Sequence, residues 1–282
     1  MYDEPHARSR SISGSLEFSV ERQELLPDAT AIKSLARHDR DPLAVFEAST
    51  RRGAATAATA AACLEAYSRA LDPLSKDDAC AKSYEDLPGK SVLHWRWQST
   101  RQHAQDFMNK FQLNYLLTYF LLREGDEELI WRWIEADCSS TFDNPDLGPI
   151  WRKWRSFLIR ELVTVKFDLA SGGPADEAVQ CLLDFAALKR RSRNLAVRRA
   201  SFHGPMTTVS QRLSTKRYPG TNPQLCSELL RLLHRYRDAF FAGHIARLHL
   251  FHPTEPNAQP TLRLLRAFAE SPGMHHLYPK TA

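Results

Sequence analysis

Amphipathic segments with a helical period follow one another along most of this chain, and glycine or proline separates them. Between residues 101 and 122 a broad apolar face includes Phe107, Phe111 and Tyr115. Because side chains three and four positions apart share one face of a helix, this spacing predicts a buried helix. Gly125 provides a stop, Asp126 is expected to cap the next helix, and residues 101–137 should therefore form a helical hairpin.

The same signals predict the other helices. Asp41-Pro42 and Asn222-Pro223 each join an N-cap residue to a proline suited to the first turn. The first pair predicts a helix over residues 42–52, and the second a long helix that continues, bent near Gly243, to Phe251. Further helices are expected over residues 54–71, 77–86, 150–167, 174–188, 205–213 and 261–269, with a weaker helical patch after the basic run 188–199, up to Phe202, and a loop over 87–100.

An amphipathic hairpin needs neighbours to cover its apolar face. The sequence therefore predicts an all-α fold, a solenoid-like stack of helical hairpins with irregular spacing, over residues 41–270. Residues 1–40 are expected to be a flexible N-terminal arm with at most a short helix near 29–37, and residues 271–282 a loose tail.

Membrane insertion is not expected, because no apolar stretch approaches the ~20 residues that cross a bilayer. The five cysteines form no CxxC pair, which argues against a disulfide framework and a zinc ribbon. An intracellular, reducing compartment fits this pattern. A mitochondrial location stays open if the start of the chain is incomplete.

The charge is distributed unevenly. Residues 1–149 hold 17 basic and 24 acidic side chains, whereas residues 150–282 hold 21 basic and 9 acidic ones. A basic second half indicates a surface for an anionic partner, or halves that attract each other.

The densest basic run is LKRRSRNLAVRR, from Leu188 to Arg199. Several cations there could neutralise phosphates and give salt-sensitive RNA binding without sequence preference. A nuclear-import signal and a solvated helix end remain alternatives. The residues expected to bind RNA are Lys189, Arg190, Arg191, Arg193, Arg198 and Arg199, joined by Arg152 and Arg155 from an earlier helix.

All six tryptophans lie beside basic residues, in the groups WRW at 95–97, WRW at 131–133 and WRKWR at 151–155. Stacking of nucleic-acid bases is one interpretation. The favoured one places tryptophan in the core and arginine in water. Residues two apart on a helix face opposite ways, so Trp131 and Trp133 should not both be buried, whereas Trp151 and Trp154 should.

Signals for catalysis are weak. Gly89-Lys90-Ser91 ends like a phosphate-binding loop, but Tyr84 stands where that motif needs its first glycine. His249 and His252 share a helical face, yet no ligand-spaced carboxylate or cysteine accompanies them, so ordinary histidines are favoured over a metal site. No nucleophile motif is present. No cofactor or metal is expected.

The segments from Gly125 to Trp133 and from Pro174 to Phe185 resemble the second helix of a pentatricopeptide or tetratricopeptide hairpin. The segment 41–46 is a poorer match, and the whole chain resembles a group of uncharacterised fungal helical proteins. The two better units start about 49 residues apart rather than 34 to 35. The resemblance implies a stacked helical scaffold, often organellar and RNA-associated, without base-reading positions that can be assigned here.

Three functional hypotheses follow. The leading one is a non-catalytic scaffold that binds RNA through its basic second half. A protein–protein interaction adaptor without nucleic acid is the alternative, and an enzyme with an unrecognised site comes third.

Overall fold

The computed structural model describes residues 28–37, 40–99, 111–136, 153–170, 172–215, 218–236 and 239–270. Within these ranges the regular structure is entirely helical, as the sequence predicted. The helices are α1 (Ala29–Ala36), α2 (Pro42–Arg51), α3 (Ala57–Leu71), α4 (Lys76–Asp86), α5 (Pro88–Gln98), α7 (Phe111–Arg123), α8 (Glu127–Glu135), α9 (Trp154–Ala170), α10 (Asp176–Arg191), α11 (Leu195–Arg199), α12 (His203–Leu213), α13 (Pro223–Leu233), α14 (Ala239–Leu250) and α15 (Gln259–Glu270).

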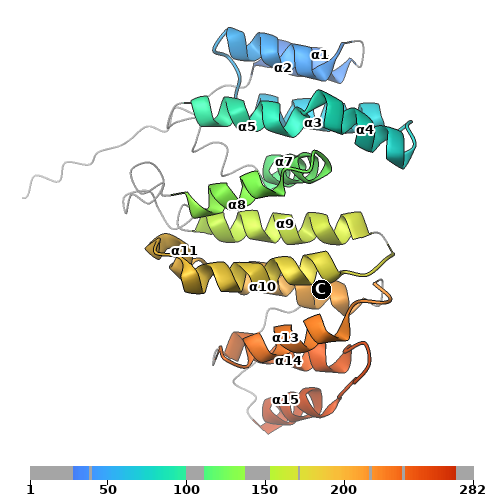
Figure 1. The fold of residues 1–282 in the computed structure, drawn as a ribbon, viewed down its shortest axis with the longest axis vertical. Helices are drawn as coiled ribbons and strands as arrows, with labels where there is room; N and C mark the ends of the chain where they lie inside the picture. The colour runs from blue at the N-terminus through green and yellow to red at the C-terminus, as the bar shows by residue number, and fades with distance from the viewer. Residues whose placement is uncertain are drawn as a thin grey trace, which may run out of the picture.

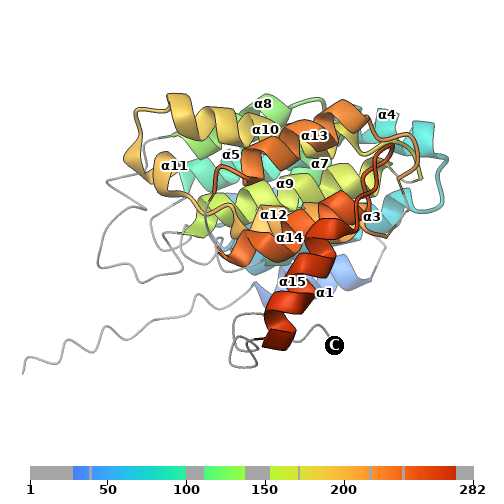
Figure 2. The same cartoon turned by 90° about the horizontal axis from the view of Figure 1, so that it is seen from below.

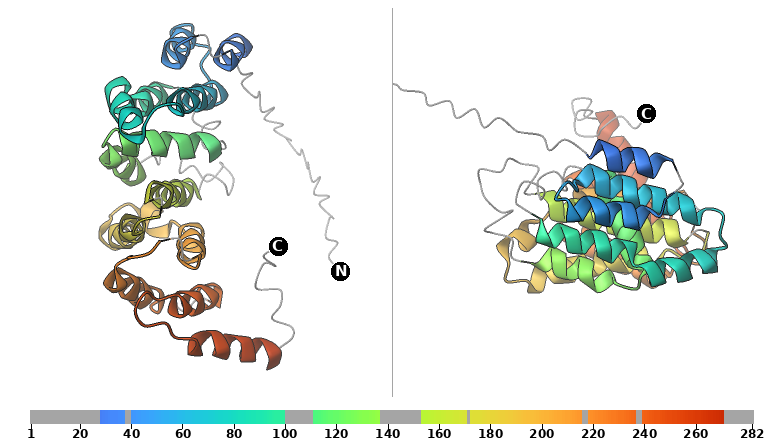
Figure 3. Two further views of the ribbon diagram at one scale, coloured as in Figure 1. Left: turned by 90° about the vertical axis from the view of Figure 1, so that its right-hand side faces the viewer. Right: turned by 90° about the horizontal axis from the view of Figure 1, so that it is seen from above.

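The helices lie in successive layers along the long axis of the molecule (Figure 1). An inner row is formed by α3, α7, α9, α12 and α14, each packed on the next, and α15 packs on α14. An outer row holds α8, α10 and α13, which lie together on the opposite side from α12 and α14 when the molecule is seen from below (Figure 2). The stack is curved, and both of its ends lean toward the side of the inner row (Figure 3, left).

Local capping explains several helix starts. The Asp41 carboxylate accepts from the Leu43 N–H at 3.1 Å, and the Asn222 side chain accepts from the Gln224 N–H at 2.9 Å. Both predicted cap-and-proline starts are confirmed. The short helix expected near residues 29–37 is α1, and its buried Ala31 and Leu35 pack into the body of the protein.

Three local predictions are wrong. Residues 88–98 form α5 rather than a loop. The long helix expected from residue 223 ends at Leu233, and α14 is a separate helix that packs back against α13. Asp126 makes no capping hydrogen bond to α8; its carboxylate lies 2.5 Å from the Lys90 ammonium.

A contact distant in sequence accounts for α5. Leu87 adopts a left-handed conformation (φ 51°) and provides no side-chain cap. Glu124, which follows the last residue of α7, caps the helix instead: its two carboxylate oxygens accept from the Gly89 N–H at 2.5 Å and the Lys90 N–H at 3.0 Å. The free N–H groups of a helix start need such acceptors. The loop prediction failed because the cap comes from another helix.

The core is continuous through the layers, with α9 at its centre between α7, α10 and α12. Trp133 and Trp154 are buried with their rings 5.9 Å apart, while Trp131 is half-buried and donates to Glu127. The expectation that Trp131 and Trp133 are not both buried is confirmed. Trp151, the predicted helical residues 101–110 and 150–152, the arm up to residue 27 and the tail 271–282 lie outside the described residues.

Candidate functional site

The predicted basic run spans the end of α10 and the short helix α11. Asn194 separates the two helices and caps α11 by accepting from the Ala196 N–H at 2.9 Å. Five of the six cations of the run have exposed side chains: Arg190, Arg191, Arg193, Arg198 and Arg199. Four of them, Arg190, Arg191, Arg198 and Arg199, lie in the last turns of α10 and α11, where they also complement the helix dipole.

The sixth cation, Lys189, points inward. Its ammonium group donates to the Ala200 carbonyl and lies 5.0 Å from the centre of the Phe202 ring. Burial lowers the pKa of this amine. Lys189 therefore holds α10 to the segment after α11, and it is not counted among the exposed cations of this surface.

Arg155 is also a structural residue. Its side chain is 2% exposed and donates to the Ile134 carbonyl at 3.0 Å and the Ala136 carbonyl at 2.9 Å. The guanidinium lies 4.4 Å from the centre of the Trp154 ring. These carbonyls belong to the C-terminal end of α8, where a helix leaves acceptors without partners. Arg155, predicted to join the RNA-binding surface, is buried here instead, and Arg152 lies outside the described residues.

A neighbouring helix adds two more arginines. The starts of α10 and α13 are joined by the Asn222 N–H, which donates to Asp176 at 2.7 Å, and the two helices run in the same direction. At their other ends Arg190, Arg231 and Arg235 line one recess of 390 Å³. We define the basic edge as the exposed arginines of these helix ends: Arg190, Arg191, Arg193, Arg198, Arg199, Arg231 and Arg235.

Carboxylates near the basic edge neutralise only part of its positive charge. Arg191 lies 3.4 Å from Glu135 and Arg231 lies 3.6 Å from Glu228, and all four side chains are about half or more exposed. Ion pairs this long and this exposed contribute little. Asp184 lines the same recess and pairs with Gln180. The basic edge thus keeps a net positive charge.

The outer-row helices are acidic at their other ends, where α8 and α10 begin. Glu127, Asp176, Glu177 and Asp184 line a recess of 400 Å³ at the starts of α8 and α10. The buried Lys166 ammonium lies within it, 2.7 Å from the Glu127 carboxylate. The outer row therefore carries negative charge at its helix starts and positive charge at its helix ends.

The tryptophans do not reinforce the basic edge. Trp95, Trp133 and Trp154 are buried, and among the described tryptophans Trp97 is the most exposed, at 53%. Trp97 belongs to α5, which lies on the far side of α8 from α10 (Figure 1). Arg96, expected in water, is buried. Base stacking by these rings at the basic edge is not supported by this arrangement.

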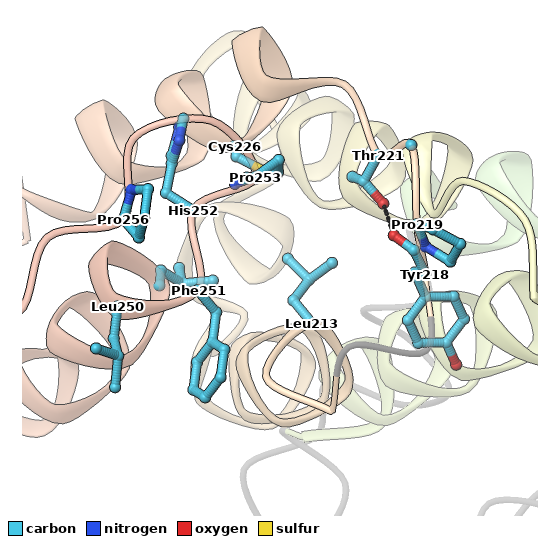
Figure 4. Close-up of a pocket in the computed structure, with 12 residues that line it drawn as sticks. Leu213, Tyr218, Pro219, Thr221, Cys226, Leu250, Phe251, His252, Pro253 and Pro256 are labelled. Atoms are coloured by element: carbon cyan, nitrogen blue, oxygen red, sulfur yellow. Dashed lines mark hydrogen bonds between the residues drawn. The ribbon is translucent and has the colours of Figure 1, made fainter.

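An apolar recess of 430 Å³ lies where α12, α13 and α14 meet (Figure 4). Its walls include the apolar side chains of Leu213, Phe251 and Pro253, and the thiol of Cys226 also lines it. Burial raises the pKa of Cys226 to about 11, so the thiol stays protonated at neutral pH. A protonated thiol is a poor nucleophile.

The described residues hold no group of three or more His, Cys, Asp or Glu side chains placed to bind a metal ion. None of the described helices is long and apolar enough to cross a membrane. Comparisons with protein-family models, curated proteins and solved structures found no match for this chain.

Proposed function

We propose that the chain is a non-catalytic helical scaffold that binds single-stranded RNA, without sequence preference, through the basic edge. Its setting in this proposal is an intracellular, reducing compartment. The observation that carries the proposal is the gathering of seven exposed arginines at one edge of α10, α11 and α13, which the carboxylates of the described residues offset only through long ion pairs. Arginine suits phosphate, because its planar guanidinium donates two parallel hydrogen bonds.

The proposal includes a solenoid-like architecture of stacked hairpins. In support, α8 begins at residue 127, α10 at 176 and α13 at 223, which are intervals of 49 and 47 residues. Each of these outer helices follows an inner one, namely α7, α9 and α12. This arrangement resembles pentatricopeptide and tetratricopeptide proteins, although the interval exceeds their 34 to 35 residues. No base-reading position of such a code is assigned to this chain.

The test is fluorescence anisotropy with a labelled, unstructured RNA over a series of salt concentrations. If the basic edge contacts phosphates, affinity falls steeply with salt, with a slope of about −0.7 per contact on a single strand. Replacing Arg190, Arg191 and Arg193 by glutamate should remove most of the binding and reduce the slope by about 2. Circular dichroism should show unchanged helicity, because these side chains are exposed.

A matched control separates local from overall charge. Arg51, Arg69 and Arg263 are exposed on α2, α3 and α15, and changing them to glutamate alters the net charge equally. That variant should bind RNA with nearly wild-type affinity, apart from a modest long-range effect. Equal loss in both variants, or no effect of the first, contradicts the assignment to the basic edge.

The alternative is a protein–protein adaptor without nucleic acid. The observation favouring it is the charge polarity of the outer row, since the acidic recess and the basic recess share Gln180 and Asp184. A protein segment carrying both charges would complement that surface better than RNA would. Absence of RNA binding at low salt, with a protein retained after nuclease treatment and lost on the Asp184→Arg change, would favour the adaptor.

A further inference from the structure

The break between α13 and α14 brings two histidines together. His234 immediately follows α13, His249 lies in the last turn of α14, and their Nε2 atoms are 3.3 Å apart. Their ring centres are 5.6 Å apart. The sequence had suggested His249 and His252 as a pair on one helix face, whereas the fold pairs His249 with a residue of the preceding helix.

Both rings line a recess of 530 Å³, with Ser227, His252, Glu255 and Asn257 around them. Both ring nitrogens of His252 already have hydrogen-bond partners. Its Nδ1 accepts from the Glu255 N–H at 3.2 Å, and its Nε2 lies 3.0 Å from the Ser227 hydroxyl. An imidazole whose Nδ1 accepts and whose Nε2 is hydrogen-bonded has no lone pair to offer. Among the described residues that line this recess, His234 and His249 are thus the two imidazoles available as ligands.

We propose that His234 and His249 bind one late first-row divalent ion, of the class of Zn²⁺ or Cu²⁺, through their Nε2 atoms. Imidazole is a preferred ligand of these ions. Zn–N bonds of about 2.0–2.1 Å that meet near the tetrahedral angle place the two nitrogens about 3.3 Å apart, which is the separation found here. No third His, Cys, Asp or Glu of the described residues completes a metal-holding group, so water fills the other positions.

The electrostatics of the recess support the ligand form of His249. Burial, followed by the neighbouring His234 and His252, lowers the pKa of His249. Metal binding requires a neutral ring, and the lowered pKa acts in that direction. Arg231 lines the same recess, and its guanidinium lies 3.6 Å from Glu228, which offsets part of its charge. A bound ion would tie the end of α13 to the end of α14.

The test uses the full chain without an affinity tag, titrated calorimetrically with Zn²⁺ and separately with Cu²⁺. His275 and His276 are first changed to asparagine, so that imidazoles of the tail do not contribute. In that background we expect one ion per chain, and His234→Asn or His249→Asn should each weaken binding at least about tenfold. His94→Asn, an exposed histidine of α5, is the matched control and should bind like the parent.

Thermal stability and the Cu²⁺ spectrum test independently whether both histidines bind the ion. Zn²⁺ should raise the thermal midpoint of the parent but not of His249→Asn, and Mg²⁺ should change neither, because binding to the folded state stabilises it by mass action. Nitrogen couplings in the Cu²⁺ electron paramagnetic resonance spectrum should indicate two imidazoles. Equal affinity in parent and His234→Asn, or no binding above the level of Mg²⁺, would mean that the pair is only hydrogen-bonded. RNA binding by the basic edge does not depend on either outcome.

Discussion

At the scale of single residues, Glu124 shows how one carboxylate connects two helices. Its side chain is buried and accepts from two backbone N–H groups at the start of α5. Burial, the largest effect, raises its pKa from 4.5 to about 7, although the two hydrogen bonds act in the opposite direction. Desolvation disfavours the charged form of an acid, so the folded protein takes up a proton more readily than the unfolded chain.

This shift predicts a pH dependence of stability. Between pH 4.5 and about 7 the folded state holds a proton that the unfolded state has lost, so the free energy of unfolding falls as pH rises through that window. The expected loss is on the order of 3 kcal/mol. Urea unfolding at several pH values should show it, and Glu124→Gln should flatten the curve, because a glutamine side chain does not titrate.

Glu128→Gln is the control, since its side chain is 75% exposed on α8. That variant should keep the parental pH dependence. If Glu124→Gln and the parent lose stability in parallel between pH 4.5 and 7, another group is responsible for the dependence.

At the scale of helices, α5 depends on a close approach to α7. A Cβ atom at Gly89 would lie 2.9 Å from the Glu124 Oε1 atom and 2.9 Å from the Leu121 backbone nitrogen. The Leu121 backbone cannot move away from such a Cβ atom as the end of a flexible side chain could. The glycine of Gly89-Lys90-Ser91 thus serves helix packing, and the N–H groups of Gly89 and Lys90 donate to the Glu124 carboxylate rather than being free for phosphate.

Gly89→Ala should therefore destabilise the protein by about 1–3 kcal/mol, because overpacking forces neighbouring backbone to shift. Gly204→Ala in α12 is the matched control: its Cβ would meet nothing closer than the Arg160 Cδ atom at 3.7 Å. There the gain in helix propensity should leave stability unchanged or up to about 1 kcal/mol higher. Chemical unfolding of both variants measures the difference, and equal effects would argue against a tight α5–α7 contact.

At the scale of the whole molecule, stability should fall from the middle of the stack toward α15. In the middle, α9 is surrounded by α7, α10 and α12 and buries even Arg155, Glu161 and Lys166. At the end, α15 contacts α14 and has no buried residue, and it leaves Leu262 and Leu265 exposed at 41% and 57%. Helices with few buried contacts open at low free energy cost.

Hydrogen exchange followed by mass spectrometry should show this gradient. Amides of α15 should exchange by local opening at least about tenfold faster than those of α9, which should exchange only on global unfolding. Uniform protection of both helices would indicate a single cooperative unit instead.

The all-α class and most helix boundaries followed from the sequence, because caps and apolar periodicity act over a few neighbouring residues. Asp41 and Asn222 start their helices by bonds to residues two positions away, and Gly125 ends α7 by its own backbone conformation (φ 76°). The exposed arginines at 190–199 were likewise visible in the sequence, since a dense run of cations seldom lies inside a core.

The tertiary structure decided the features that depend on residues distant in the chain. Glu124 made a helix of the predicted loop over 88–98, and packing against α13 made α14 a separate helix. Arg155 and Lys189 turned inward because the carbonyls of Ile134, Ala136 and Ala200 needed donors. A sequence pattern reports which residues favour water or helix locally, but a buried polar group is satisfied by whichever partner the fold brings within hydrogen-bonding distance.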